Sequence, residues 1–252
     1  MQNDWPKKYT RDPIVEVIIG VRFDGAKTAE QRLQQIHEQL ERELPGPAQD
    51  LWWIDVSTQL ANQEFAAQAV PRFGHRVFSS ADGQWRLTVG DGLAALHVMR
   101  PYPGWKEQVR ERAGKMLAVC TGQMEAYRLR EVSVRYVDEI ALPQNRPLAT
   151  YFQIRSEWPE QGGEQNTGFD MLLRRRFPSS RARGQVRFFS LPDRPAGLQR
   201  FVLDVAAIRQ PEDEAIELDD LQRHLEELHL LQRQVFESVI TKDLQDLLGA
   251  KR

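Results

Sequence analysis

The feature that most constrains the fold is an apolar stripe of period two near the start of the chain. Within residues 14–24, every second position is apolar: Val15, Val17, Ile19, Val21 and Phe23. Successive side chains of a β-strand point to opposite faces, so this spacing predicts a strand with one buried face. The other face mixes Glu16 and Arg22 with apolar residues. This mixture indicates a strand inside a sheet that is partly covered on both sides.

A second stripe of the same kind occupies residues 131–142. Its apolar members are Val132, Val134, Tyr136, Ile140 and Leu142. Asp138 interrupts the stripe, which indicates a β-bulge or an exposed strand end. The two stripes therefore predict two long strands, each opening one half of the chain.

Between and after these strands, the chain alternates helical and extended patterns. Thr28 followed by Gln31 has capping-box spacing and predicts a helix that ends at Pro45. A second helix is expected over residues 104–124, and a short one near residues 148–156. Residues 51–73 and 158–168 are expected to be irregular. The further predicted strands cover residues 76–80, 85–89, 93–99, 169–177, 184–191 and 198–208.

The last part of the chain predicts one long helix with a leucine seam. Asp219 or Asp220 can cap its start. Leu221, Leu225 and Leu228 are spaced by three and four residues, as in a coiled-coil seam. The seam is expected to pack on the sheet of its own chain; the alternative is a homodimer interface through this C-terminal helix.

The order β-α-β-β-β-α therefore occurs twice. We predict an α+β fold with antiparallel sheets, helices packed on one face and a long C-terminal helix. Residues 1–125 form the first half and residues 126–252 the second, within one compact unit. Sequence identity between the halves is weak, so an internal duplication and a coincidence both stay open.

Composition excludes several functional classes. The 252 residues carry 34 Lys and Arg against 36 Asp and Glu, a net charge of -2, so no overall field steers the protein toward polyanions. Cys120 is the single cysteine, which excludes an internal disulfide and fits a reducing compartment. No apolar leader or membrane-length apolar run is present, and we expect a cytoplasmic protein without a membrane contact.

Catalytic and metal-binding motifs are absent from the sequence. The five histidines include no HExxH pair, and the chain has no Walker A loop, GxSxG elbow or GxGxxG turn. Cys120 has no neighbouring base and reads as a small buried residue. The sequence therefore predicts no cofactor, no metal and no catalytic residue, and it favours a protein that is not an enzyme.

Arginines supply the candidate binding residues. Arg22 and Arg135 occupy equivalent places in the two stripe-bearing strands, opposite the apolar stripe. They either line a groove for an anionic ligand or a partner peptide, or pair with carboxylates of neighbouring strands. A denser group lies in the predicted hairpin of residues 169–191: Arg174, Arg175, Arg176, Arg181, Arg183 and Arg187. Strand alternation divides this group between two faces. It fits a protein partner, a nucleic acid or a charged solvated edge.

Three segments resemble a sporadically distributed bacterial family of uncharacterised proteins of about this length. They are DPIVEVIIGVRF at residues 12–23, VRYVDEIALP at residues 134–143 and LHLLQRQVFESVIT at residues 228–241. Gly20 departs from the larger residue usual at its position. The resemblance implies no activity. The patchy distribution of the family is typical of mobile cassettes such as toxin–antitoxin or phage-defence modules.

These observations favour a non-catalytic binding or regulatory subunit that contacts a protein partner through an arginine-bearing sheet surface. The first alternative is a nucleic-acid-binding protein that uses the Arg174–Arg187 hairpin. The second is a small-molecule binder or an enzyme of unknown class, with its site between the sheet and the helices.

Overall fold

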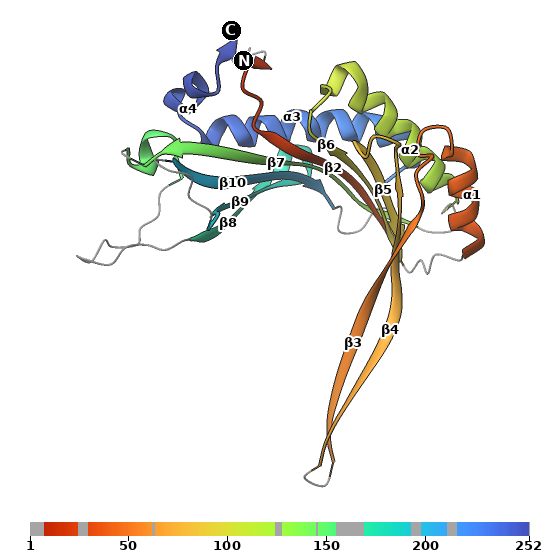
Figure 1. Cartoon of the computed structure of the whole chain (residues 1–252). Coiled ribbons are helices and arrows are strands. Elements are labelled where there is room, and N and C mark those ends of the chain that lie inside the picture. Colours follow the sequence, from red (N-terminus) through yellow and green to blue (C-terminus); the bar gives the residue numbers. More distant parts are fainter. Residues whose placement is uncertain are drawn as a thin grey trace.

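Nine strands form one antiparallel sheet, and the four α-helices of the described chain lie on one side of it (Figure 1). The computed structural model describes residues 8–24, 30–61, 64–123, 128–144, 146–154, 169–192, 198–210 and 216–251. The strand order is β3-β4-β5-β6-β2-β7-β10-β9-β8. This arrangement confirms the predicted α+β class with helices on one face.

The helices and strands have the following residue ranges, given in chain order. Those of the first half are β1 Lys8–Tyr9, β2 Ile14–Phe23, α1 Glu30–Leu40, β3 Gln49–Ala61, β4 Glu64–Ser79, β5 Trp85–Gly90, β6 Leu93–Met99, a π-helical turn Trp105–Val109 and α2 Arg110–Gln123. Those of the second half are β7 Leu129–Pro143, β8 Asp170–Phe177, β9 Ala182–Ser190, β10 Leu198–Arg209, α3 Leu221–Val239, α4 Lys242–Leu247 and β11 Ala250–Lys251.

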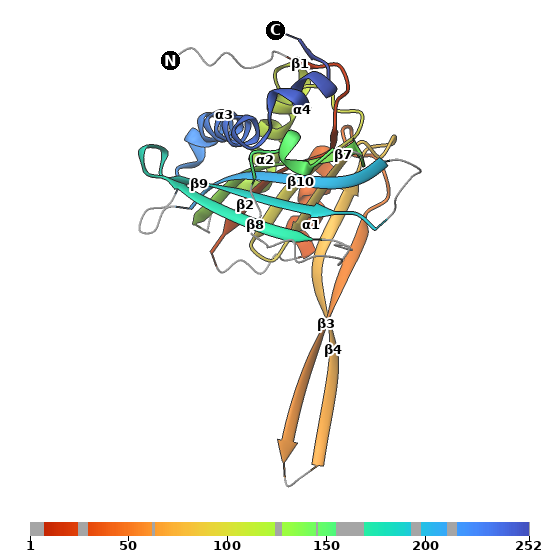
Figure 2. The same cartoon turned by 90° about the vertical axis from the view of Figure 1, so that its left-hand side faces the viewer.

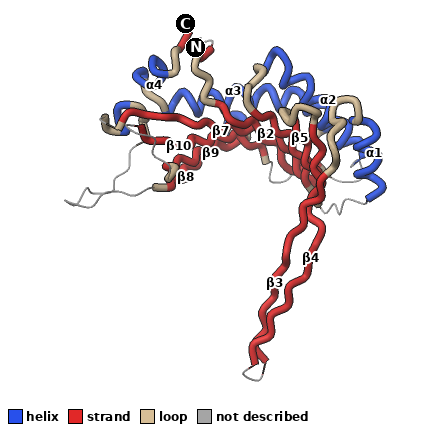
Figure 3. The backbone as a smooth tube through the Cα atoms, viewed as in Figure 1, coloured by secondary structure: helices blue, strands red, loops and turns tan. Residues whose placement is uncertain are grey.

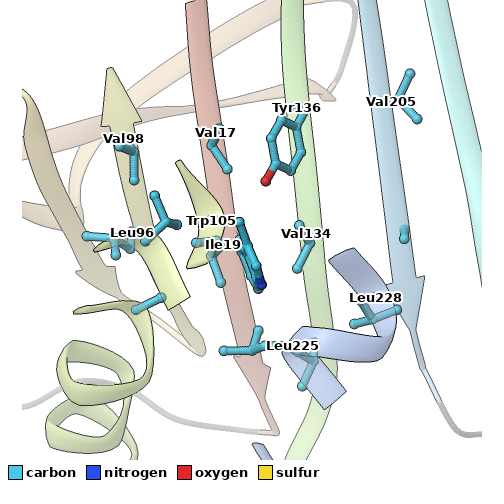
Figure 4. Packing of buried hydrophobic residues seen from close by; sticks show 14 of the residues in the cluster. Val17, Ile19, Leu96, Val98, Trp105, Val134, Tyr136, Val205, Leu225 and Leu228 are labelled. Carbon is cyan, nitrogen blue, oxygen red and sulfur yellow. The ribbon is translucent and has the colours of Figure 1, made fainter. Parts of the chain in front are cut away.

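The two predicted apolar stripes meet at the centre of the sheet. β2 pairs with β7, with Ile19 opposite Val134 and Val17 opposite Tyr136. These side chains point toward the helices and are buried (Figure 4). The core thus forms because the apolar faces of both central strands and of the helices exclude water together.

Helix α3 lies across β7, β10 and β9, and the leucine seam packs against them. Leu225 and Leu228 are at most 1% exposed. The helix ends at Val239, since Ile240 is extended and forms a β-bridge with Phe152. The prediction of one uninterrupted terminal helix is therefore wrong. A short helix, α4, follows, and the Thr241 hydroxyl accepts a hydrogen bond from the Leu244 N–H at its start.

Strands β3 and β4 form a long hairpin that projects from the sheet on the side away from the helices (Figure 3). The prediction that residues 51–73 are irregular is therefore wrong. β5 pairs with β4 only from His75 onward, so the hairpin continues without a third strand. The pairing shifts by one residue at Gly74, between Leu51 and Trp52. Such a bulge bends a strand and increases its twist.

The two predicted β-α-β-β-β-α halves are not found as such. Four strands rather than three follow α1 in the first half, because β3 is added. In the second half, a 3-10 turn at Leu148–Thr150 is the only helical element described between β7 and β8. Thr28, the expected helix cap, lies outside the described residues. Among the described residues, no helix is both long and apolar enough to cross a membrane.

Two segments far apart in sequence close one end of the molecule. β1 pairs with β11, so that Lys8 lies opposite Lys251, and both lie beside α4 (Figure 2). The chain then runs from β1 into β2 over the end of α3, where Tyr9 packs edge-on against Phe236. This crossing places the residues before β2 above the sheet and next to α3.

Candidate functional site

The side of the sheet opposite the helices, here called the open face, carries most of the candidate arginines. Strand alternation and the pairing register put Arg22, Arg135, Arg174, Arg176, Arg183 and Arg187 on it. Arg175 falls on the other side of β8, where its guanidinium lies 5.5 Å from the Phe177 ring centre. Arg181 lies in the turn before β9 with a left-handed φ of 49°. The predicted division of this group between two faces is confirmed.

Arg135 is held at the middle of the open face by Asp204 of β10. Its Nε and Nη2 donate to the two carboxylate oxygens at 2.7 and 2.6 Å, a bidentate pair. The hydrogen bonds to Asp204 raise the pKa of Arg135. Asp204 is only 5% exposed, although none of the described helices covers this side. The pair therefore fixes a cation and its partner in one geometry.

Arg22 and Arg183 share a carboxylate. The Arg22 Nε lies 3.5 Å from Glu131, and the Arg183 Nη2 lies 3.8 Å from the other oxygen of the same group. The Arg183 Nε is buried without a hydrogen bond. At the sheet edge, Arg187 donates to Asp170 of β8 at 3.0 Å and stacks over Phe189 at 5.1 Å. The open face is thus a set of ion pairs rather than a field of uncompensated cations.

Apolar side chains fill the spaces between these pairs. Ile18, Met99, Val137 and Phe189 all lie on the open face and are partly exposed. Leu172, at the β8 edge, is 45% exposed. The open face therefore combines ion-paired arginines with partly exposed apolar side chains.

The histidines and the cysteine give no metal centre. No group of three or more His, Cys, Asp or Glu side chains is placed to hold a metal ion in the described chain. His97 pairs with Glu16 at 2.8 Å, and this hydrogen bond lowers the pKa of Glu16. Cys120 is fully buried in α2, which raises the pKa of its thiol to about 12. Such a thiol stays protonated and unreactive at neutral pH.

A second candidate site, which the sequence analysis missed, lies on the helix side. It is a cavity of about 470 Å³ between the segment before β2, the π-helical turn, β7 and α3. The side chains that matter for its chemistry are Tyr9, Asp12, Tyr102, Trp105, Tyr136, Asp138, His229, Arg233, Phe236 and Glu237. This cavity is called the polar cavity below.

One wall of the polar cavity is a hydrogen-bonded aromatic network. The Tyr136 hydroxyl lies 2.9 Å from the Tyr102 hydroxyl and 3.1 Å from Nδ1 of His229. His229 stacks on Trp105 with ring centres 4.3 Å apart, and the Trp105 indole N–H donates to Glu226 at 2.8 Å. Burial lowers the pKa of His229 to about 3. The imidazole is therefore neutral at physiological pH, so the wall can be buried without placing a charge away from water.

Asp138 faces the polar cavity because strand alternation puts it on the same side of β7 as Val134 and Tyr136. The β2–β7 register shifts between Ile14 and Glu16, and Ile14 faces Asp138. The predicted bulge therefore exists, but on the neighbouring strand, and Asp138 is not at an exposed end: it is 2% exposed. It makes no hydrogen bond or ion pair with any residue described. Burial first, and then the Asp12 and Asp204 carboxylates, raise its pKa well above the ordinary value.

Glu237 is a second buried carboxyl group at the polar cavity, and it differs from Asp138 in being satisfied. The Tyr9 hydroxyl donates to both of its oxygens at 3.1 Å, and the Gln245 amide donates at 3.0 Å. Burial still raises its pKa above the ordinary value. Asp138 thus differs from Glu237 because it is buried without a hydrogen-bond partner among the described residues.

Comparisons with known proteins add no family. No protein-family model matches the sequence, and no curated protein is similar to it. The fold and its two sites define an α+β protein with one antiparallel sheet, an ion-paired open face and a polar cavity beneath α3. Its resemblance to a sporadically distributed bacterial family stays a prediction.

Proposed function

We propose that this chain is a non-catalytic binding subunit that holds another protein against the open face of its sheet. The observation that carries the proposal is the alternation of ion-paired arginines with partly exposed apolar side chains on the side of the sheet that the described helices leave uncovered. Arginines that are already oriented by carboxylates lose less conformational freedom when a partner binds. Apolar groups between them supply the buried area that an interface needs.

The charge balance of the open face favours a protein over a nucleic acid. Binding to a phosphate backbone draws its free energy from cations that neutralise phosphates and release counterions. Arg22, Arg135 and Arg187 already face Glu131, Asp204 and Asp170 within the same surface. A phosphate would have to compete with these carboxylates, whereas a protein surface can complement both signs of charge.

The strand order supports a further proposal, that the two halves arose by duplication. Outward from β2 the strands are β6, β5 and β4, and outward from β7 they are β10, β9 and β8. On both sides, the last strand of the half lies next to its central strand, and earlier strands lie progressively further out. The family resemblance adds the proposal that the partner belongs to a bacterial cassette of the toxin–antitoxin or phage-defence kind.

A site-specific crosslink tests the protein-binding proposal. We would place photoreactive benzoylphenylalanine at Leu172, on the open face, and at Leu230, which is 52% exposed on α3. Irradiation in the native host should give a protein adduct from position 172 and none from position 230. An adduct with nucleic acid, or no adduct from position 172, would overturn the proposal.

A matched pair of charge reversals provides the control. Arg187→Glu removes a 49% exposed, ion-paired arginine from the open face, and Arg223→Glu removes a 56% exposed, ion-paired arginine from α3. The first should abolish the adduct at position 172, and the second should leave it intact. Equal effects of both substitutions would show that the open face is not the contact surface.

A further inference from the structure

We propose that the polar cavity binds a small primary amine, with the ammonium group held by the carboxylate of Asp138. This site lies on the opposite side of the sheet from the open face, and the proposal does not depend on the protein-binding function.

The first argument is the unpartnered state of Asp138. In folded proteins, the large majority of buried polar side-chain atoms have a hydrogen-bond partner. Asp138 is 98% buried, given its 2% exposure, and it lines the cavity without a partner among the described residues. Both of its oxygens therefore remain available to donors that enter the cavity.

The second argument is the sign of the charges around the cavity. The ionisable groups that line it are Asp12 before β2, Asp138 on β7, Lys106 and Glu107 of the π-helical turn, and Arg233 and Glu237 of α3, together with the neutral His229. Carboxyl groups outnumber basic groups in this set, and both Asp12 and Arg233 already have interactions of their own. The Asp12 and Asp204 carboxylates create a negative field at Asp138. A cation bound beside Asp138 would be stabilised by this field, whereas an anion would be repelled by it.

The third argument selects the kind of cation. The walls are rich in aromatic rings, including Tyr9, Tyr102, Tyr136 and Phe236. Such rings favour a nearby cation and cover aliphatic chains. A quaternary ammonium has no N–H to offer, but a primary ammonium has three donors for the Asp138 oxygens. A cavity of about 470 Å³ lies within the usual range for small ligands.

Binding would be linked to a proton. Burial favours the protonated form of Asp138 in the empty cavity, because an isolated carboxylate is costly there. An arriving ammonium ion keeps its own proton and favours the ionised form of Asp138, so the carboxyl proton leaves to solvent. One proton is therefore released for each amine bound, and the affinity rises with pH while the amine stays charged.

The test is isothermal titration calorimetry with putrescine as the probe and 1,4-butanediol as its uncharged counterpart of similar length. Putrescine should bind the wild-type protein at millimolar or lower concentration, and butanediol should not. Asp138→Asn should weaken putrescine binding at least tenfold. Asp170→Asn, which removes an exposed carboxylate from β8, should leave it unchanged. Absence of putrescine binding, equal binding of butanediol, or full affinity in Asp138→Asn would overturn the proposal.

A second measurement needs only the wild-type protein. Titrations in phosphate and in HEPES, a buffer without a primary amine and with a different ionisation enthalpy, should give apparent enthalpies that differ by the amount for one released proton. Equal enthalpies in the two buffers would show that Asp138 does not ionise on binding, and this would also overturn the proposal.

Discussion

Replacing Asp138 with Asn should stabilise the protein at neutral pH, and the gain should increase with pH. Burial favours the protonated form of this carboxyl group in the folded protein and raises its pKa well above the ordinary value. The unfolded chain ionises it above a pH of about 4. A group whose pKa is raised on folding loses its contribution to stability as the pH rises from the unfolded pKa toward the folded one. The wild type therefore loses stability over this range, and the Asn variant does not.

The size of the effect follows from linkage. Where the unfolded chain is ionised at Asp138 and the folded protein is not, the free energy of unfolding falls by about 1.4 kcal/mol for each pH unit. Between pH 5 and pH 7, the variant should gain on the wild type by up to about 3 kcal/mol. Asn has nearly the same shape as a protonated Asp, so packing changes contribute little.

The assay is urea unfolding of both proteins at several pH values in phosphate buffer without amines, followed by tryptophan fluorescence. Asp170→Asn serves as the control, and its effect on stability at neutral pH should have the opposite sign. The reason is that the hydrogen bond from Arg187 lowers the pKa of Asp170. Parallel stability curves for the wild type and Asp138→Asn, or a variant that is less stable at pH 7, would refute the reasoning.

Four further outcomes are expected. Ile19→Ala, in the fully buried centre of β2, should lower the free energy of unfolding by about 2–5 kcal/mol in urea titrations; a loss below about 1 kcal/mol would contradict the central packing. Arg135→Ala should cost about 1–3 kcal/mol by leaving Asp204 unpaired, and adding Asp204→Ala should recover part of it, which a double-mutant cycle measures. Cys120 should react with a thiol reagent only in denaturant, since its thiol pKa is about 12 and its side chain is buried; rapid native labelling would be inconsistent with this. The His229 ring should show no NMR titration between pH 5 and 8, because its pKa is about 3.

The sequence predicted the central part of the fold because that part obeys a simple period. β2 and β7 each bury one face, so apolar residues recur at every second position, and their pairing follows. The β3–β4 hairpin was missed although Trp52, Ile54, Val56 and Leu60 of β3 recur with the same period. The sequence did not show where this stripe lies: β5 pairs with β4 only from His75 onward, and the rest of the hairpin extends away from the helices.

The candidate sites show a similar limit. Alternation along β8 and β9 was sufficient to divide the arginines between two faces. It did not show that Arg135 pairs with Asp204, which lies 69 positions later in the chain. The interruption of the β7 stripe by Asp138 was visible in the sequence. Its meaning depends on α3 and on the segment before β2, which enclose the group only in the folded chain.

The length of the β3–β4 hairpin sets a scale for anything that binds to it. From Trp52 opposite Phe73 to Ala61 opposite Glu64, the ribbon continues for a distance of about 30 Å, at roughly 3.3 Å per residue. A rotation of about 10° at the Gly74 bulge would displace its tip by about 5 Å over that length. A molecule that touches both the far end of this ribbon and the open face must therefore span this distance.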